Sequence, residues 1–125
     1  MTKTFKSDKP IYIQVRERIE DQIINEELIE GEQIPSTSQL VNFYKINHLT
    51  VSKGVNQLVE EGILYRKRGI GTFVSEGARD ILLKKRKETF FEDHIINLVR
   101  EARKLGITKD EIIAFIQKAE RQDEI

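Results

Sequence analysis

The sequence contains no cysteine and no tryptophan, and it has only two histidines, two prolines and one methionine. Without cysteine the chain can form no disulfide, and it offers neither a thiol nucleophile nor a thiolate ligand for a metal ion. With so few histidines, a metal site would depend on carboxylates. The catalytic and metal-binding chemistry open to this chain is therefore narrow, and we expect no cofactor and no metal.

The N-terminus also lacks the long apolar run of a targeting segment. Lys3, Lys6 and Lys9 are not followed by the apolar stretch that a signal peptide requires. With 34% charged and 38% hydrophobic residues, the chain is too charged for a membrane span and too apolar for disorder. Its 125 residues suit one domain with a modest extension. We expect a helix-rich, cytoplasmic protein with no membrane partner.

Charge is balanced over the whole chain, with 21 basic and 21 acidic residues, but it is unevenly distributed. Residues 1–32 hold five basic and eight acidic side chains, and residues 33–75 hold five basic and two acidic ones. The middle of the chain thus carries five minus two, or +3, while the last 50 residues hold eleven of each sign. Because phosphate binding depends on the local field, this distribution is compatible with a DNA partner.

The first strong pattern is an amphipathic helix. Apolar residues recur every four positions between Pro10 and Ile29, with charged residues between them. Asp8 is of the N-cap type, Pro10 suits the first turn, and Gly31 suits the end of the run. The pattern predicts one helix over this whole range.

Three further elements follow this helix. A capping box opens a short helix over 37–44, and an asparagine precedes a longer helix over 48–61 that stops at a glycine. Two short β-type runs, 63–65 and 72–74, flank two glycines and a basic tip, which indicates a hairpin. This order of elements is the winged form of the helix-turn-helix, and the predicted fold is mostly α with a small β hairpin.

In a helix-turn-helix the second helix enters the major groove with its N-terminal residues against the base edges. If the apolar side of helix 48–61 is buried, a step of about 100° per residue places Leu49, Lys53 and Asn56 on the opposite side. Lysine reaches guanine or phosphate, asparagine can bond adenine, and leucine can cover a thymine methyl group. An exposed leucine is also a common surface residue without function, so both interpretations of Leu49 stay open.

The hairpin supplies a second candidate contact. Arginine reaches phosphate or a narrow minor groove, and glycine lets the backbone approach a groove wall. A basic hairpin tip is usually only solvated, but its place directly after the recognition-helix pattern favours DNA contact. We interpret the basic run over 84–87, in contrast, as the solvated face of a helix. The residues that we expect at the DNA are Ser36, Thr37, Ser38, His48, Leu49, Thr50, Ser52, Lys53, Asn56, Arg66, Arg68, Gly69 and Gly71.

The C-terminal residues form a separate pattern. A row of apolar residues is spaced 4, 3, 4 and 3 positions apart, as in the seam between packed helices. Gly106 suits the end of that helix, and Thr108 with Glu111 forms a capping box for a final helix to about Glu120. We therefore expect a DNA-binding domain over 9–77 and a two-helix dimerisation tail over 78–125. The dimerisation residues that we expect are Phe91, Ile95, Leu98, Ala102 and Leu105.

Taken together, these motifs resemble the GntR family of bacterial transcription regulators, over about residues 9–77. The tail is similar to the short two-helix extension of the YtrA-type subfamily. Many family members carry arginine where Ser38 and Ser52 stand, and glycine where Lys45 stands, so we expect a left-handed backbone at Lys45. The matching signature residues are Gly31, Ile34, Pro35, Ser36, Leu40, Thr50, Val51, Leu58, Glu61, Gly62, Ile63, Gly69, Gly71, Thr72, Phe73 and Val74.

The resemblance implies a homodimeric repressor that binds an inverted-repeat operator in double-stranded DNA and controls a transporter-type operon. The residues themselves do not give the operator sequence, the regulated genes, the sign of regulation or any effector ligand. One alternative is a winged-helix module for protein–protein assembly, in which Glu60 and Glu61 face a partner. A small enzyme is the third possibility, but acidic residues adjacent in sequence point apart on a helix and give no acid–base pair.

Overall fold

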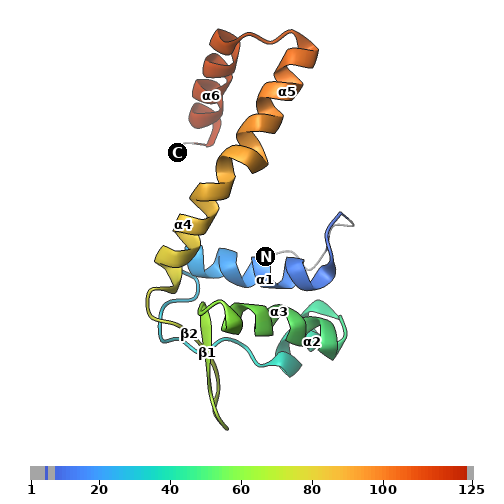
Figure 1. Cartoon of the computed structure of the whole chain (residues 1–125), viewed down its shortest axis with the longest axis vertical. Coiled ribbons are helices and arrows are strands. Elements are labelled where there is room, and N and C mark those ends of the chain that lie inside the picture. The colour runs from blue at the N-terminus through green and yellow to red at the C-terminus, as the bar shows by residue number, and fades with distance from the viewer. Residues whose placement is uncertain (1–4, 6–7, 124–125) are drawn as a thin grey trace. The chain divides into compact units, whose positions relative to one another are not determined.

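The computed structural model describes residue 5 and residues 8–123, which belong to two compact units, Met1–Lys85 and Arg86–Ile125 (Figure 1). The division falls later than the boundary expected after Gly77. The division falls later because the first residues of α4 (Ala78–Phe90) belong to the core of the first unit. Ala78 and Leu82 are both fully buried there.

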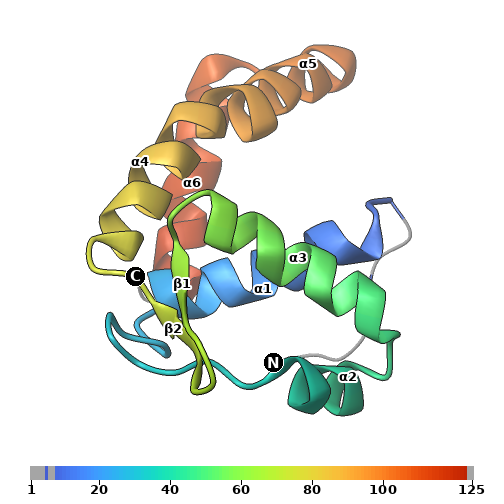
Figure 2. The same cartoon turned by 60° about the horizontal axis from the view of Figure 1, so that its bottom comes forward.

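Before the start of α4, the described part of the first unit contains three helices and a hairpin, in the predicted order. The helices are α1 (Ile11–Ile24), α2 (Thr37–Tyr44) and α3 (His48–Glu60), and the antiparallel strands are β1 (Leu64–Lys67) and β2 (Gly71–Val74). α1 lies along α3, with α2 near the start of α3 and the hairpin beyond its end (Figures 1 and 2). The predicted class, mostly α with a small β hairpin, is confirmed.

α1 is shorter at its C-terminal end than the apolar spacing predicted. The helix ends at Ile24, and Glu26 has a positive φ of 61°. The amides of Glu27 and Leu28 both donate to the Gln22 carbonyl oxygen, at 2.8 and 3.1 Å. This turn carries Leu28 into the core, where it is buried. Leu28 therefore belongs to a turn, although it follows Ile24 by four positions, as it would in a helix.

The N-terminal prediction for α1 was also wrong in detail. Pro10 is the N-cap residue, one position before the first turn, and the cap has no side-chain hydrogen bond. Asp8 is therefore not the cap. The amides of Ile13 and Gln14 instead donate to the Pro10 carbonyl oxygen at 3.1 and 3.2 Å. Since proline has no amide hydrogen to satisfy, it fits this end of a helix.

The caps of α2 and α3 are confirmed. Ser36 Oγ accepts a hydrogen bond from the Gln39 amide at 3.1 Å, and Gln39 Oε1 accepts one from the Ser36 amide at 2.8 Å. Asn47 Oδ1 caps α3 by accepting from the Thr50 amide at 2.8 Å. Lys45, between the two helices, has φ 58° and ψ 42°, which is the expected left-handed conformation. These local bonds set the tight turn of the motif.

The hairpin is anchored to the segment that precedes α2. The amides of Gly31 and Ile34 donate to the carbonyl oxygens of Val74 and Thr72 at 2.8 and 2.9 Å, and the Val74 amide donates to Glu32 at 2.9 Å. This segment forms an edge beside β2. The core of the unit comprises Val15, Ile19, Ile23, Leu28, Ile34, Leu40, Tyr44, Val51, Val55, Leu58, Ile63, Leu64, Val74, Ala78 and Leu82.

In the second unit, the helix that begins as α4 continues through a π-helical turn, η1 (Phe91–Ile95), into α5 (Ile96–Leu105). Gly106, with φ 69°, ends α5, and α6 (Lys109–Asp123) runs past the predicted end at Glu120. The second capping box is confirmed, because Thr108 and Glu111 exchange bonds at 2.9 and 3.2 Å. None of the described helices is long and apolar enough to cross a membrane.

Candidate nucleic-acid interface

α3 is fixed to α1 by its apolar face. Val51, Val55 and Leu58 are buried there, as predicted. Gly54 lies on the same side, and a Cβ atom at this position would come within 2.7 Å of the Tyr12 backbone oxygen, closer than side chains allow. Glycine therefore permits the close approach of the two helices. The opposite face of α3 is left at the surface of the unit.

That opposite face carries the predicted recognition residues. Leu49 is 81% exposed, and Lys53 and Asn56 are also exposed. The Lys53 ammonium lies 4.0 Å from the centre of the Tyr12 ring, a cation–π contact that restrains an otherwise flexible side chain. Sequence reasoning missed Tyr12, because an aromatic residue in an amphipathic helix gives no signal that it contacts a lysine from another helix.

The starts of α2 and α3 hold the predicted polar residues. Ser36 acts as the N-cap of α2, while Ser38 is exposed and Thr37 is half-buried. In the first turn of α3, His48 Nδ1 lies 3.4 Å from Ser52 Oγ. Free backbone amides and the positive end of the helix dipole favour an anion at such a terminus. Thr50 is half-buried beside this turn.

The hairpin is longer than predicted. Arg66 and Lys67 were assigned to the loop, but they lie in β1, where they pair with Thr72 and Gly71. Both side chains are exposed at the end of this strand, so their charges stay in water and do not prevent strand pairing. Only Arg68 remains as a charged side chain of the turn itself.

The tip of the hairpin is held from one side by Gln33. Its Nε2 donates to the Ile70 carbonyl oxygen at 3.2 Å. A Cβ atom on Gly71, which has φ 154°, would come within 2.3 Å of the same Gln33 nitrogen. The backbone conformation favours glycine here, and a larger side chain would also displace the end of Gln33. Neither feature was visible in the sequence, where Gln33 belongs to no motif.

The hairpin is tied to α3 from its other side. Nη2 of Arg66 donates a hydrogen bond to Oδ1 of Asn56. Lys67 lies over the Phe73 ring, with its ammonium 4.7 Å from the ring centre. Arg68 and Gly69 are exposed at the tip, and Gly69 has φ 77°. The structure thus brings the predicted helix and hairpin residues into one region of the first unit.

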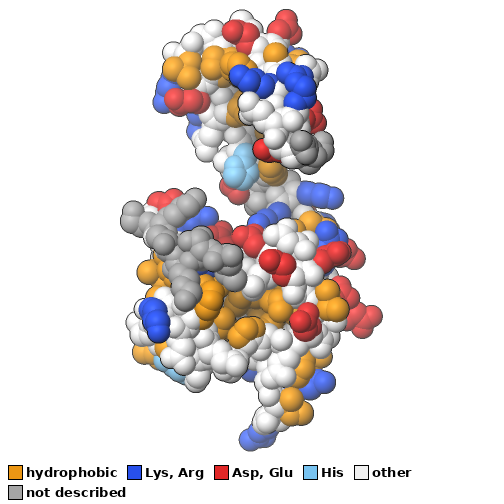
Figure 3. All heavy atoms as spheres, turned by 180° about the vertical axis from the view of Figure 1, so that it is seen from behind, with side chains coloured by type: hydrophobic (Ala, Val, Ile, Leu, Met, Phe, Trp, Pro, Cys, Tyr) orange, Lys and Arg blue, Asp and Glu red, His pale blue; other side chains and the backbone are white. Residues whose placement is uncertain are grey.

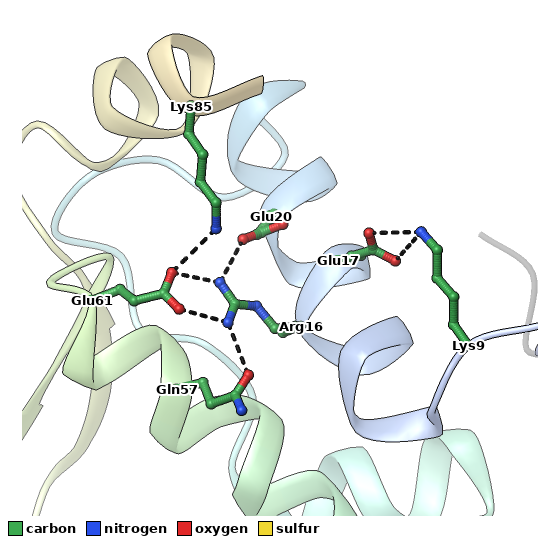
Figure 4. Close-up of polar contacts among 7 residues, drawn as sticks. All are labelled: Lys9, Arg16, Glu17, Glu20, Gln57, Glu61 and Lys85. Atoms are coloured by element: carbon green, nitrogen blue, oxygen red, sulfur yellow. Dashed lines mark hydrogen bonds and ion pairs between the residues drawn. The ribbon is translucent and has the colours of Figure 1, made fainter. Parts of the chain in front are cut away.

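A charged cluster fixes the far end of α3 (Figure 4). The guanidinium of Arg16, a residue only 7% exposed, donates to both carboxylate oxygens of Glu61, at 2.5 and 2.6 Å. It also donates to Gln57 at 2.9 Å and to Glu20 at 3.1 Å. Lys85 of α4 reaches Glu61 at 3.4 Å. This network of five side chains, the Arg16 cluster, joins α1, α3 and α4.

The electrostatics of the Arg16 cluster follow from these contacts. The hydrogen bond from Arg16 lowers the pKa of Glu61, and burial only partly opposes this effect. The same bond raises the pKa of Arg16. Glu61 therefore stays ionised and bound within the unit. This placement weighs against the alternative in which Glu61 faces a protein partner.

The predicted dimerisation residues lie in the second unit with mixed exposure. Ala102 is buried and Ile95 is half-buried, whereas Phe91, Leu98 and Leu105 are 60%, 40% and 65% exposed. The helix that carries them contains the π turn, which interrupts the regular spacing used to predict the seam. Orange hydrophobic side chains are visible at the top of Figure 3. Other exposed apolar residues of this unit are Phe90, Val99, Ile113, Phe115 and Ile116.

The described residues contain no group of three or more histidine, aspartate or glutamate side chains that could hold a metal ion. The chemistry of the site is instead that of exposed cations, amides and hydroxyls on a helix and a hairpin. Such groups bind phosphates and base edges.

Comparison with known proteins places this arrangement in a family. Residues 11–74 match the model described as "Bacterial regulatory proteins, gntR family". The chain is 29% identical to the uncharacterized HTH-type transcriptional regulator YhcF of Bacillus subtilis (strain 168), over 94% of this chain and 95% of that protein. It is 28% identical to the HTH-type transcriptional repressor YtrA of the same organism, over 90% of this chain and 86% of that protein.

Solved structures agree with these relatives. A transcriptional regulator of the GntR family from Bacteroides thetaiotaomicron is 34% identical, with a TM-score of 0.69 over 90% of this chain and 98% of that one. The DNA-binding domain of AraR in complex with operator ORX1 is 30% identical, with a TM-score of 0.55 over 58% of this chain and 93% of that one. The similarity to YtrA extends along most of this chain, which is consistent with the YtrA-type subfamily. The chain therefore belongs to the GntR family of DNA-binding transcription regulators, which are not enzymes.

Proposed function

We propose that this chain binds an inverted-repeat operator as a homodimer, with α3 of each protomer in the major groove and the hairpin on the backbone or in the adjacent minor groove. The observation that carries the proposal is the exposed face of α3 directly beside a basic hairpin. Leu49 and Lys53 supply an apolar and a cationic contact there, and Arg66 joins the hairpin to the helix.

The remaining predicted residues suit contacts to the DNA backbone. Hydroxyl groups and helix N-termini bind phosphate without carrying sequence information. An exposed cation at the hairpin tip does the same, and its glycines allow close approach. We assign this positioning role to Ser36, Thr37, Ser38, His48, Thr50, Ser52, Arg68, Gly69 and Gly71.

The second unit is proposed as the dimerisation element. Phe91, Leu98 and Leu105 are large apolar side chains that stay exposed within one chain. Burying one such side chain contributes about 1.5–3 kcal/mol, and a twofold interface counts each residue twice. A few of them can therefore sustain a dimer. Dimerisation raises the effective concentration of the second DNA-binding domain at the second half-site.

We propose that the chain represses transcription, because several of its relatives are named as repressors. YtrA and NagR of Bacillus subtilis (strain 168) are both named as HTH-type transcriptional repressors. A protein that covers an operator blocks access of other proteins to the same DNA, so a dimer of this size fits repression. The resemblance to YtrA-type regulators extends the proposal to a transporter-type operon as the target.

Selection of bound duplexes from a random DNA pool tests the proposal. We expect an inverted repeat whose half-sites lie about one or two helical turns apart. Binding to the selected duplex should weaken steeply between about 50 and 200 mM salt, because each phosphate contact releases counterions. A pool that shows no enrichment, or an affinity that does not change with salt, would refute DNA recognition.

A further inference from the structure

We propose that Asn56 is a positioning residue for Arg66, so that the recognition helix and the hairpin contact DNA as one coupled unit. This inference rests on the DNA-binding function proposed above and revises the role that the sequence predicted for Asn56. The sequence pattern assigned an adenine contact to Asn56 and a separate phosphate or minor-groove contact to Arg66. The structure joins these two side chains instead.

The geometry of the pair is set by rigid elements on both sides. Asn56 follows buried Val55 in α3, and its exposed amide oxygen accepts the hydrogen bond from Arg66. Arg66 pairs with Thr72 in the hairpin, so the register of β1 and β2 fixes its backbone. The bond therefore connects two elements whose positions do not depend on it. It selects one orientation for the long arginine side chain.

The hydrogen-bonding capacity of each group defines its role. An asparagine that reads adenine accepts from the N6 amino group with Oδ1 while its Nδ2 donates to N7. In this structure Oδ1 of Asn56 already accepts from Arg66. The guanidinium has five N–H donors, and the bond to Asn56 leaves others available for a phosphate. Oδ1 of Asn56 has a second lone pair, so the bond to Arg66 does not saturate it, but the bond ties the orientation of the amide to the position of Arg66. Asn56 is thus suited to hold Arg66, and any base contact that it makes depends on that arginine.

The other arginine of the hairpin provides a contrast. Arg68 is exposed in the turn, and no hydrogen bond holds its side chain within the described part of the chain. Such a side chain must lose its conformational freedom when it binds a phosphate. Arg66 has lost part of that freedom before DNA arrives, which favours its contact. Of the two arginines, Arg66 is therefore the one whose contribution depends on the recognition helix.

The salt dependence of binding tests this inference, because Asn56 itself carries no charge. One phosphate-bound cation contributes about 0.9 to the slope of log affinity against log salt. We compare the wild type with Asn56→Ala, Arg66→Ala and the double variant, on the selected duplex and on an unrelated duplex of equal length. Arg66→Ala should lower the slope by about 0.9. Asn56→Ala should lower it as well, and the double variant should be no weaker than Arg66→Ala.

Matched controls separate this effect from loss of structure. Asn25→Ala makes the same change at an exposed asparagine after α1 and should leave the slope unaltered. Asn56→Leu keeps the approximate side-chain volume but removes the acceptor, so it should reproduce Asn56→Ala. All variants should keep the thermal unfolding midpoint of the wild type, because both residues are exposed.

Two results would overturn the inference while leaving DNA binding intact. The first is an unchanged salt slope for Asn56→Ala together with an altered base preference at one operator position, which would make Asn56 an independent reader. The second is additive losses of affinity in the double variant. A wild-type protein that binds neither duplex in a salt-dependent way would refute the proposed function itself, and with it this inference.

Discussion

Replacing Glu61 by glutamine tests whether the Arg16 cluster stabilises the first unit through charge. The substitution keeps the size of the side chain and one hydrogen-bonding oxygen, but it removes the negative charge next to Arg16. Arg16 would retain Glu20, whose carboxylate lies 3.1 Å away, so the buried guanidinium would not be left without a counter-charge. The loss of stability should therefore be smaller than in a variant that leaves a buried charge with no partner.

The magnitude follows from the exposure of the two partners. The Arg16 side chain is 9% exposed, but that of Glu61 is 40% exposed and partly screened by water. Hydrogen bonds to charged groups contribute about 1.5–3 kcal/mol, whereas exposed ion pairs contribute about 0–1 kcal/mol. A pair between these limits should lower the free energy of unfolding by about 1–2 kcal/mol when it is broken at pH 7.

The pH dependence provides the sharper part of the test. The pKa of Glu61 is lower in the folded protein than its ordinary value of 4.5, chiefly because of the hydrogen bond from Arg16. A lowered folded-state pKa contributes stability above the unfolded-state pKa, and this contribution is lost as the pH falls through the folded-state pKa. The difference in the free energy of unfolding between wild type and Glu61→Gln should therefore be largest near pH 7 and should decrease below about pH 4.5.

Urea unfolding followed by tyrosine fluorescence measures this difference in the right part of the molecule. The chain has three tyrosines and no tryptophan, and all three tyrosines lie in the first unit. Glu60→Gln is the matched control, because Glu60 is an adjacent, exposed carboxylate with no ion pair among the described residues. It should change stability by less than about 0.5 kcal/mol. Equal effects of the two substitutions, or a Glu61→Gln difference that persists undiminished at low pH, would refute the reasoning.

Three further predictions concern packing, DNA and assembly. Gly54→Ala should lower the free energy of unfolding by about 1–3 kcal/mol in the same urea assay, because its Cβ atom would push the Tyr12 backbone away from α3. Lys53→Ala should change base preference in a selection experiment, whereas Arg68→Ala should weaken all duplexes alike and lower the salt slope by about 0.9. Leu98→Glu should shift sedimentation toward the monomer and weaken full-operator binding, while the tyrosine-monitored unfolding of the first unit stays unchanged.

The parts of the fold that could be predicted are those encoded by local signals. Ser36 and Gln39 lie three residues apart and satisfy each other's backbone, so the start of α2 is determined within four residues of sequence. Asn47 defines the start of α3 in the same way. The exposure of Leu49 also follows from helix geometry once the apolar side of α3 is known. Local caps and periodicity therefore gave the order of elements and the recognition face.

The contacts that organise the site could not be predicted, because they join residues far apart in the chain. Arg16 meets Glu61 across 45 positions, and Gln33 reaches Ile70 across 37. In the sequence nothing marks Arg16 as the partner of Glu61, or Gln33 as a partner of the hairpin backbone. The end of α1 was missed for a related reason, since Leu28 enters the core through a turn that has helical spacing. Only the tertiary packing shows which polar residues pair and where α1 ends.

The Arg16 cluster also explains how a chain with zero net charge can present a basic face. The net charge of residues 33–75 is +3, and this sum includes the negative charge of Glu61. In the structure that carboxylate is bound by Arg16 from the acidic N-terminal stretch, and Glu17 of the same stretch pairs with Lys9 at 3.0 Å. Acidic side chains are thus matched close to α1, while Lys53 and Arg68 stay exposed. Because screened charges act over only about 10 Å at 0.1 M salt, DNA phosphates bound at the proposed interface would respond to those nearby cations and not to the total charge.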